Sequence, residues 1–200
     1  YARERVQSRA VEGSSGPVAI IQHPDVRRLL MSMRAQVEAA RAVALVAASY
    51  NDIAHAHPDA AQRKQAKAAY EYLVPIVKGW STEMSIDVAS AGVQVHGGMG
   101  FIEETGAAQY YRDARILTIY EGTTAIQAND LVGRKTAREG GATARAFAQA
   151  MRATAGELAA SGHADLAAIG GRLSAAVDAY VATVEFVVAQ ARSDVRAVYA

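Results

Sequence analysis

Apolar side chains recur at steps of three and four positions along most of the chain, which is the period of an amphipathic helix. The first such stripe predicts a long helix from about Asp25 to about His55. The members of that stripe are Val26, Leu30, Met33, Val37, Ala40 and Ala44. A second stripe, from Tyr70 to Val95, predicts another long helix with a kink at Pro75 and an end at Gly97-Gly98.

The rest of the pattern is helical as well. Residues 106–117 and 125–138 suit short helices, and Gly140-Gly141 predicts a hinge after them. Two further stripes, separated by a break at Ser161-Gly162, predict a helical hairpin. No alternation with period two persists, so we expect an all-α fold: an antiparallel helical bundle followed by extra helices.

The pattern also indicates two domains and two cut ends. We expect a helical bundle domain over residues 1–139 and a truncated helical extension over residues 140–200. The segment Tyr1–Gln7 reads as the middle of a polar helix without a capping residue, and the last apolar stripe continues to Ala200. These features favour a domain taken from a longer polypeptide.

Composition narrows the class of protein. The chain has 21 basic and 20 acidic side chains, so it lacks the positive charge typical of proteins that bind nucleic acid or anionic membranes. It has no cysteine, which excludes disulfides and thiolate metal sites within these residues. No apolar run approaches the roughly 20 residues of a membrane span. We therefore expect a soluble, cytoplasmic protein with no membrane span and no metal.

The segment Ile116–Thr124 carries the most informative chemistry. It places Glu121 at what the pattern indicates is an apolar strand-to-turn junction. Thr124 and Gln127 have capping-box spacing, so a helix should begin at Ala125 with its dipole directed at the carboxylate. Burial among apolar neighbours would suit such a carboxylate to proton abstraction. A purely structural role in the first turn of a helix is the alternative.

The segment Gln94–Phe101 contains a Gly-Gly-x-Gly string directly after the second long helix. Glycines in that position often only terminate a helix. They also let a flat or anionic cofactor approach the backbone closely, because they have no Cβ. His96 lies within the string, and since the other histidines are scattered we expect it to have a polar packing role.

Together with Tyr111-Arg112-Asp113-Ala114, these strings resemble the carboxyl-terminal domain of flavin-dependent acyl-CoA dehydrogenases over residues 1–135. The resemblance implies that Glu121 is the catalytic base and that Glu121 and Gly122 contact the substrate. It implies FAD contacts from Gln94, Gly97 and Gly98, from Thr123, and from Arg5 to the pyrophosphate. For Arg112 and Asp113 we expect a structural ion pair.

The implied reaction is the FAD-dependent α,β-dehydrogenation of an acyl-CoA thioester to trans-2-enoyl-CoA in fatty acid β-oxidation. Glu121 would take the α-proton and flavin N5 the β-hydride. The family assembles as homodimers or dimers of dimers and passes electrons to an electron-transferring flavoprotein. Two alternatives stay open: an acyl-CoA oxidase that reduces oxygen, and a non-catalytic helical oligomerisation module.

Overall fold

The computed structural model describes residues 1–199, and these residues are mostly helical, which confirms the predicted fold class. They form two compact units. Unit 1 contains Tyr1–Ser49 and Val77–Thr124, and unit 2 contains Tyr50–Ile76 and residues 125–199. The two long helices contribute residues to both units. The expected domain boundary after residue 139 stays a prediction.

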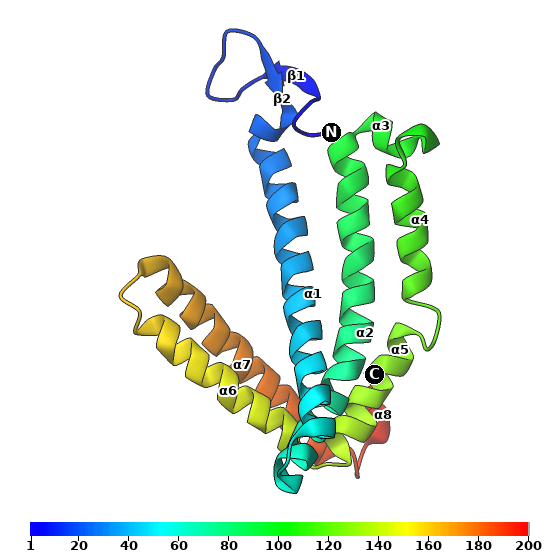
Figure 1. Cartoon of the computed structure of the whole chain (residues 1–200), viewed down its shortest axis with the longest axis vertical. Coiled ribbons are helices and arrows are strands. Elements are labelled where there is room, and N and C mark those ends of the chain that lie inside the picture. The colour runs from blue at the N-terminus through cyan, green and yellow to red at the C-terminus, as the bar shows by residue number, and fades with distance from the viewer. Residues whose placement is uncertain (200) are drawn as a thin grey trace. The chain divides into compact units, whose positions relative to one another are not determined.

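The first long helix has nearly the bounds that the periodicity predicts, whereas the second ends where expected but begins at Ala60, well before Tyr70. Helix α1 spans Pro24–Ala56 and helix α2 spans Ala60–His96. A connection of only three residues joins them, so they are antiparallel (Figure 1). Helix α2 continues through Pro75. One backbone hydrogen bond of the helix is missing there, because proline has no N–H.

Helix α4, Ala107–Leu117, packs with α1 and α2 in unit 1 (Figure 1). Most of the side chains buried on these three helices in unit 1 are small. They are Ala40 and Ala47 on α1, Met84 and Val95 on α2, and Ala107, Ala108 and Ala114 on α4. The short helix α3, Gly98–Phe101, and the 3-10 turn η2, Glu103–Thr105, connect α2 to α4.

The helix predicted over Tyr1–Gln7 is wrong. A turn there leads into strand β1, Val6–Arg9, which pairs antiparallel with β2, Pro17–Ala19. The segment has no apolar stripe to bury as a helix, and the glycine- and serine-rich stretch after β1 reverses the chain instead. A 3-10 turn η1, Ile20–Gln22, then leads into α1.

Unit 2 is built around a helical hairpin, as predicted. Helix α6, Ala142–Ala159, and helix α7, Ala164–Gln190, pack antiparallel after the short α5, Thr124–Asn129, and a π-helical segment η3, Asp130–Ala137 (Figure 1). Helix α8, Val195–Tyr199, follows them. Tyr72, Ala144 and Val184 form the buried cluster of this unit.

Helix α7 corrects one expectation from the sequence. By length and composition this helix is apolar enough to cross a membrane, although the core helix of a soluble protein meets the same criterion. Val177, Val184 and Val187 of α7 are buried, but only 17% of the apolar 18-residue stretch that meets this criterion is buried within the described residues.

Candidate active site

The turn that carries Glu121 follows a helix. Helix α4 ends at Leu117, and the chain turns over residues 118–122 before α5 begins at Thr124. The predicted strand-to-turn junction is therefore wrong, because the apolar residues before Glu121 belong to an amphipathic helical turn. The backbone N–H of Thr124 donates to the carbonyl of buried Thr118 at 3.2 Å, which closes the turn into a ring.

Glu121 has an unusual backbone conformation. Its φ is +51°, in the left-handed region, and Gly122 follows with a φ of +97°. A residue with a Cβ rarely adopts this conformation, and it persists where the surrounding structure holds it. The Glu121 side chain is exposed within this chain, as are its neighbours Ile119 and Tyr120. The burial expected for this carboxylate is therefore absent, because its apolar neighbours lie on the same exposed turn.

Helix α2 holds the turn at both ends. Lys78 Nζ donates to the carbonyls of Leu117 at 2.9 Å and Gly122 at 2.7 Å. The hydroxyl of Thr124 donates to the carboxylate of Glu83, so the predicted capping box with Gln127 is not the contact that this side chain makes. Neither Lys78 nor Glu83 was among the site residues predicted from the sequence. The available signal was a charged residue, Lys78, within the apolar stretch that ends at Trp80.

A second group of predicted site residues lies around the carboxyl end of α2. Arg5, Gln94 and Gly97 line one cavity of about 370 Å³. Gly98 follows Gly97 directly, and a Cβ placed on either glycine would meet no atom within 4 Å. Arg5 is thus brought together with a segment far along the sequence, Gln94–Gly97, beside an open stretch of backbone.

Aromatic stacking and backbone hydrogen bonds fix this arrangement. The Tyr1 ring stacks on His96 at 4.3 Å between ring centroids, and its hydroxyl donates to the His96 carbonyl at 3.2 Å. His96 therefore has the packing role expected for it. The backbone N–H of Ile20 donates to the Arg5 carbonyl at 2.8 Å, so the β-hairpin anchors the backbone of Arg5 while its side chain is exposed.

This cavity suits an extended anionic group. An exposed guanidinium offers paired donors for phosphate oxygens, the Gln94 amide offers both a donor and an acceptor, and the glycines leave the backbone open to contact. A dinucleotide such as FAD has a diphosphate of this kind. The residues present therefore fit the cofactor that the resemblance implies.

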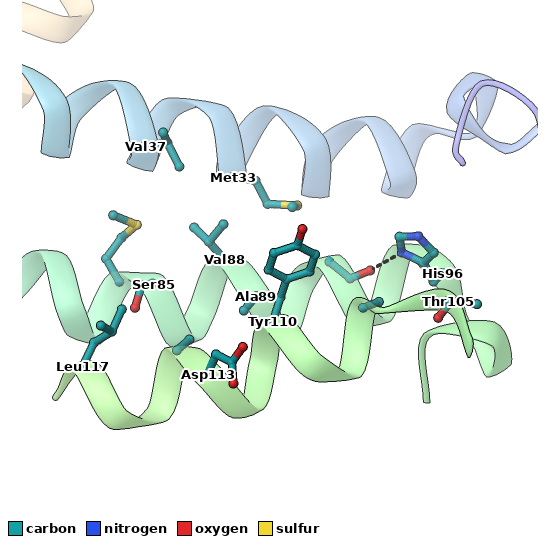
Figure 2. A pocket seen from close by; sticks show the side chains of 14 residues that line it. Met33, Val37, Ser85, Val88, Ala89, His96, Thr105, Tyr110, Asp113 and Leu117 are labelled. Atoms are coloured by element: carbon teal, nitrogen blue, oxygen red, sulfur yellow. Dashed lines mark hydrogen bonds between the residues drawn. The ribbon is translucent and has the colours of Figure 1, made fainter. Parts of the chain in front are cut away.

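A larger hollow of unit 1 lies elsewhere. It measures about 590 Å³ and lies among α1, α2 and α4, with an almost wholly apolar lining. Figure 2 shows Tyr110 of α4 with its hydroxyl directed toward Met33 of α1. None of the predicted site residues lines this hollow, so size alone does not mark the site.

The remaining contacts correct one expectation about the α4 region. Arg112 lies 3.4 Å from the Glu103 carboxylate and donates to Gln109, whereas Asp113 accepts from Gln109. The expected Arg112–Asp113 ion pair is therefore wrong, because adjacent side chains on a helix point in different directions. Within residues 1–199 no three His, Asp or Glu side chains are grouped so that they could hold a metal.

These features define a class of protein: an all-α domain that combines a strained turn carrying a carboxylate with a cavity suited to a dinucleotide. A family model described as the acyl-CoA dehydrogenase carboxyl-terminal domain matches residues 2–136. The chain belongs to the acyl-CoA dehydrogenase family.

Several relatives share this similarity. A 3-methylmercaptopropionyl-CoA dehydrogenase of Ruegeria pomeroyi is 55% identical over 201 aligned residues, which cover 100% of this chain and 34% of the relative. A broad-specificity linear acyl-CoA dehydrogenase of Mycobacterium tuberculosis is 38% identical over 70% of this chain and 24% of its own length. A caffeyl-CoA reductase-Etf complex subunit of Acetobacterium woodii is 40% identical over 26% of this chain and 14% of its own length. The chain thus spans about a third or less of these relatives.

Proposed function

We propose that the intact protein is an FAD-dependent acyl-CoA dehydrogenase that converts an acyl-CoA thioester to its trans-2-enoyl-CoA, and that Glu121 is its base. The observation that carries the proposal is the Glu121 turn, in which a left-handed backbone presents a carboxylate outward in a chain of this family. Such a conformation is retained at cost and is concentrated at functional sites.

The residues of the turn have distinct roles in this proposal. The Glu121 carboxylate takes the α-proton of the thioester, and the Glu121 backbone N–H donates to the thioester oxygen, where negative charge develops. Gly122 lets the substrate lie close to the backbone because it has no Cβ. When bound, FAD supplies the acceptor for the β-hydride.

The second residue group holds the cofactor. At the carboxyl end of α2, Arg5 pairs with the diphosphate, and Gln94, Gly97 and Gly98 add contacts beside it. A further FAD contact comes from Thr123, directly after the Glu121 turn. The family resemblance places these contacts across a subunit interface, so we propose a homodimer or a dimer of dimers. We also propose a cytoplasmic location.

The substrate and the electron acceptor follow from the relatives. One relative is named for 3-methylmercaptopropionyl-CoA and another for linear acyl-CoA, so both thioester types belong in a substrate panel. An electron-transferring flavoprotein is the proposed acceptor, which the name of the Etf complex subunit supports.

The test is an anaerobic titration of the intact flavoprotein with this panel. We expect one or more thioesters to bleach the flavin absorbance and to yield the trans-2-enoyl-CoA. Rapid reoxidation of the reduced flavin by oxygen would favour an oxidase instead. A colourless intact protein that binds no flavin would contradict the proposal and favour an oligomerisation module.

A further inference from the structure

The Lys78 side chain contacts the Glu121 turn both before and after Glu121. Its ammonium donates to the carbonyl of Leu117, the last residue of α4, and to the carbonyl of Gly122, the residue after Glu121. The Tyr120 ring lies 5.6 Å from Nζ, within the range of a cation-π contact. One half-buried cation therefore contacts three residues of a six-residue stretch.

The contacts match what an ammonium can offer. Lysine has three N–H donors and no acceptor, and here two of them satisfy carbonyls that face the same point. The carbonyl end of a helix carries partial negative charge, so a cation is favourable at the end of α4. Among residues 1–199, Lys78 has no carboxylate within ion-pair distance. Its polar contacts are therefore those with the Glu121 turn.

The conformation of Glu121 explains why such a bridge is needed. A left-handed φ at a residue with a Cβ reverts to an ordinary conformation unless neighbouring contacts hold it. The Lys78 bridge fixes the carbonyls on both sides of Glu121. Glu83, five residues further along α2, holds Thr124 from the same helix.

We propose that Lys78 is a positioning residue that holds the Glu121 turn in the conformation needed for proton abstraction. This inference rests on the proposed function of Glu121. Lys78 does not touch the reacting atoms in this account. It acts by fixing the direction of the Glu121 carboxylate and of the Glu121 N–H.

The test compares Lys78→Met with Lys78→Arg in the intact flavoprotein. Met keeps most of the length of the side chain but donates no hydrogen bond, whereas Arg keeps donors in a wider, planar arrangement. In Lys78→Met we expect anaerobic flavin reduction at saturating acyl-CoA to slow by about 10- to 100-fold, as for a small misplacement of a catalytic group. Flavin content and the apparent dissociation constant of acyl-CoA should stay near wild type, and Lys78→Arg should recover part of the rate.

Hydrogen exchange supplies a readout that does not depend on activity. Backbone amides of residues 118–124 should exchange faster in Lys78→Met, while those of α2 keep their protection. The matched control is Lys64→Met, which removes an exposed lysine of the same helix and should change neither measurement.

The outcomes separate this inference from the proposed function. A wild-type reduction rate in Lys78→Met would overturn the positioning role. Loss of flavin and of reduction together, with no recovery in Lys78→Arg, would also overturn it and make Lys78 a residue of the general fold. A Glu121→Gln variant measured in parallel tests the base itself: normal reduction in that variant would refute the proposed function, whereas its loss beside a normal Lys78→Met would refute only the inference.

Discussion

Arg5 is the one arginine or lysine among the residues that line the cavity at the end of α2, and its guanidinium is exposed there. If it pairs with the FAD diphosphate, Arg5→Ala should weaken flavin binding by about 1.5–3 kcal/mol, the scale of a hydrogen bond to a charged group. Arg5→Lys should recover only part of this, because an ammonium lacks the paired donors of a guanidinium. Flavin dissociation constants of the intact protein measure both effects.

The control for Arg5 is Arg3→Ala, which removes an equally exposed arginine that does not line the cavity. We expect that variant to bind flavin as wild type does. An Arg5→Ala protein with unchanged affinity would place Arg5 among the solvated surface residues instead.

Gly98 and Gly100 of the Gly-Gly-x-Gly string have different expected roles. Gly100 allows close helix packing, whereas Gly98 leaves the backbone open to the cofactor. A Cβ on Gly100 would lie 2.2 Å from the Val93 carbonyl oxygen, whereas one on Gly98 would meet nothing within 4 Å. Gly100→Ala should therefore destabilise the fold by about 1–3 kcal/mol through overpacking. Gly98→Ala should leave the melting temperature near wild type and weaken flavin binding.

Thermal unfolding and flavin titration of the two glycine variants check this difference. A Gly98→Ala variant that keeps full flavin affinity would show that this backbone is not a cofactor contact. A fully stable Gly100→Ala variant would contradict the close packing of α3 on α2.

At the scale of elements, two tyrosine hydroxyls join the helices of unit 2. The Tyr180 hydroxyl of α7 donates to the Ala144 carbonyl of α6 at 3.2 Å and shares a hydrogen bond of 2.7 Å with the Tyr72 hydroxyl of α2. Tyr180→Phe removes both hydrogen bonds and should lower stability by about 1–3 kcal/mol. Tyr110→Phe is the control, because the Tyr110 side chain is 75% exposed. The melting temperature of each intact variant measures the effect, and equal values in the two variants would contradict it.

The same hydroxyl predicts a dependence on pH. Burial, together with the hydrogen bond to Tyr72, raises the pKa of Tyr180 above its usual value of 10.0. The unfolded chain releases this proton near pH 10 while the folded chain retains it, so the stabilisation is complete below pH 10 and is lost as the pH rises further. The difference in melting temperature between wild type and Tyr180→Phe should therefore shrink above about pH 10. A difference that grows with pH would contradict this assignment.

The sequence predicted elements well where one periodic stripe determined them. Helices α1, α2, α6 and α7 each carry a stripe long enough to outweigh local preferences. The bounds of α1 lie close to the expected ones, and α6 and α7 lie on either side of the predicted break at Ser161-Gly162, but α2 begins well before its stripe. The β-hairpin was missed because strands of four and three residues show too little alternation to be distinguished from a polar helix.

The sequence predicted the site residues only as separate short motifs and not as residues that share a cavity. Motif resemblance picked out Arg5, Gln94 and Gly97, but their shared cavity depends on the stacking of Tyr1 on His96, which no spacing rule predicts. Lys78 and Glu83 were missed for the same reason. Their contacts join residues about 40 positions apart through hydrogen bonds that leave no periodic signal.

At the scale of the whole molecule, this chain supplies part of the proposed active site. It spans 34% of its 55% identical relative, and its Glu121 turn is exposed together with the apolar side chains of Ile119 and Tyr120. An exposed carboxylate beside exposed apolar groups is what one face of a composite site would show.

The measurement that tests the account most directly is flavin reduction by acyl-CoA in Glu121→Gln, made anaerobically in a single turnover of the intact protein. The amide is nearly isosteric with the carboxylate, so the fold, the flavin content and the binding of a product-like enoyl-CoA should survive. The rate of reduction should fall by about 10²- to 10⁴-fold, the usual contribution of a general base. Near-normal bleaching of the flavin in this variant would contradict the assignment of Glu121 as the base.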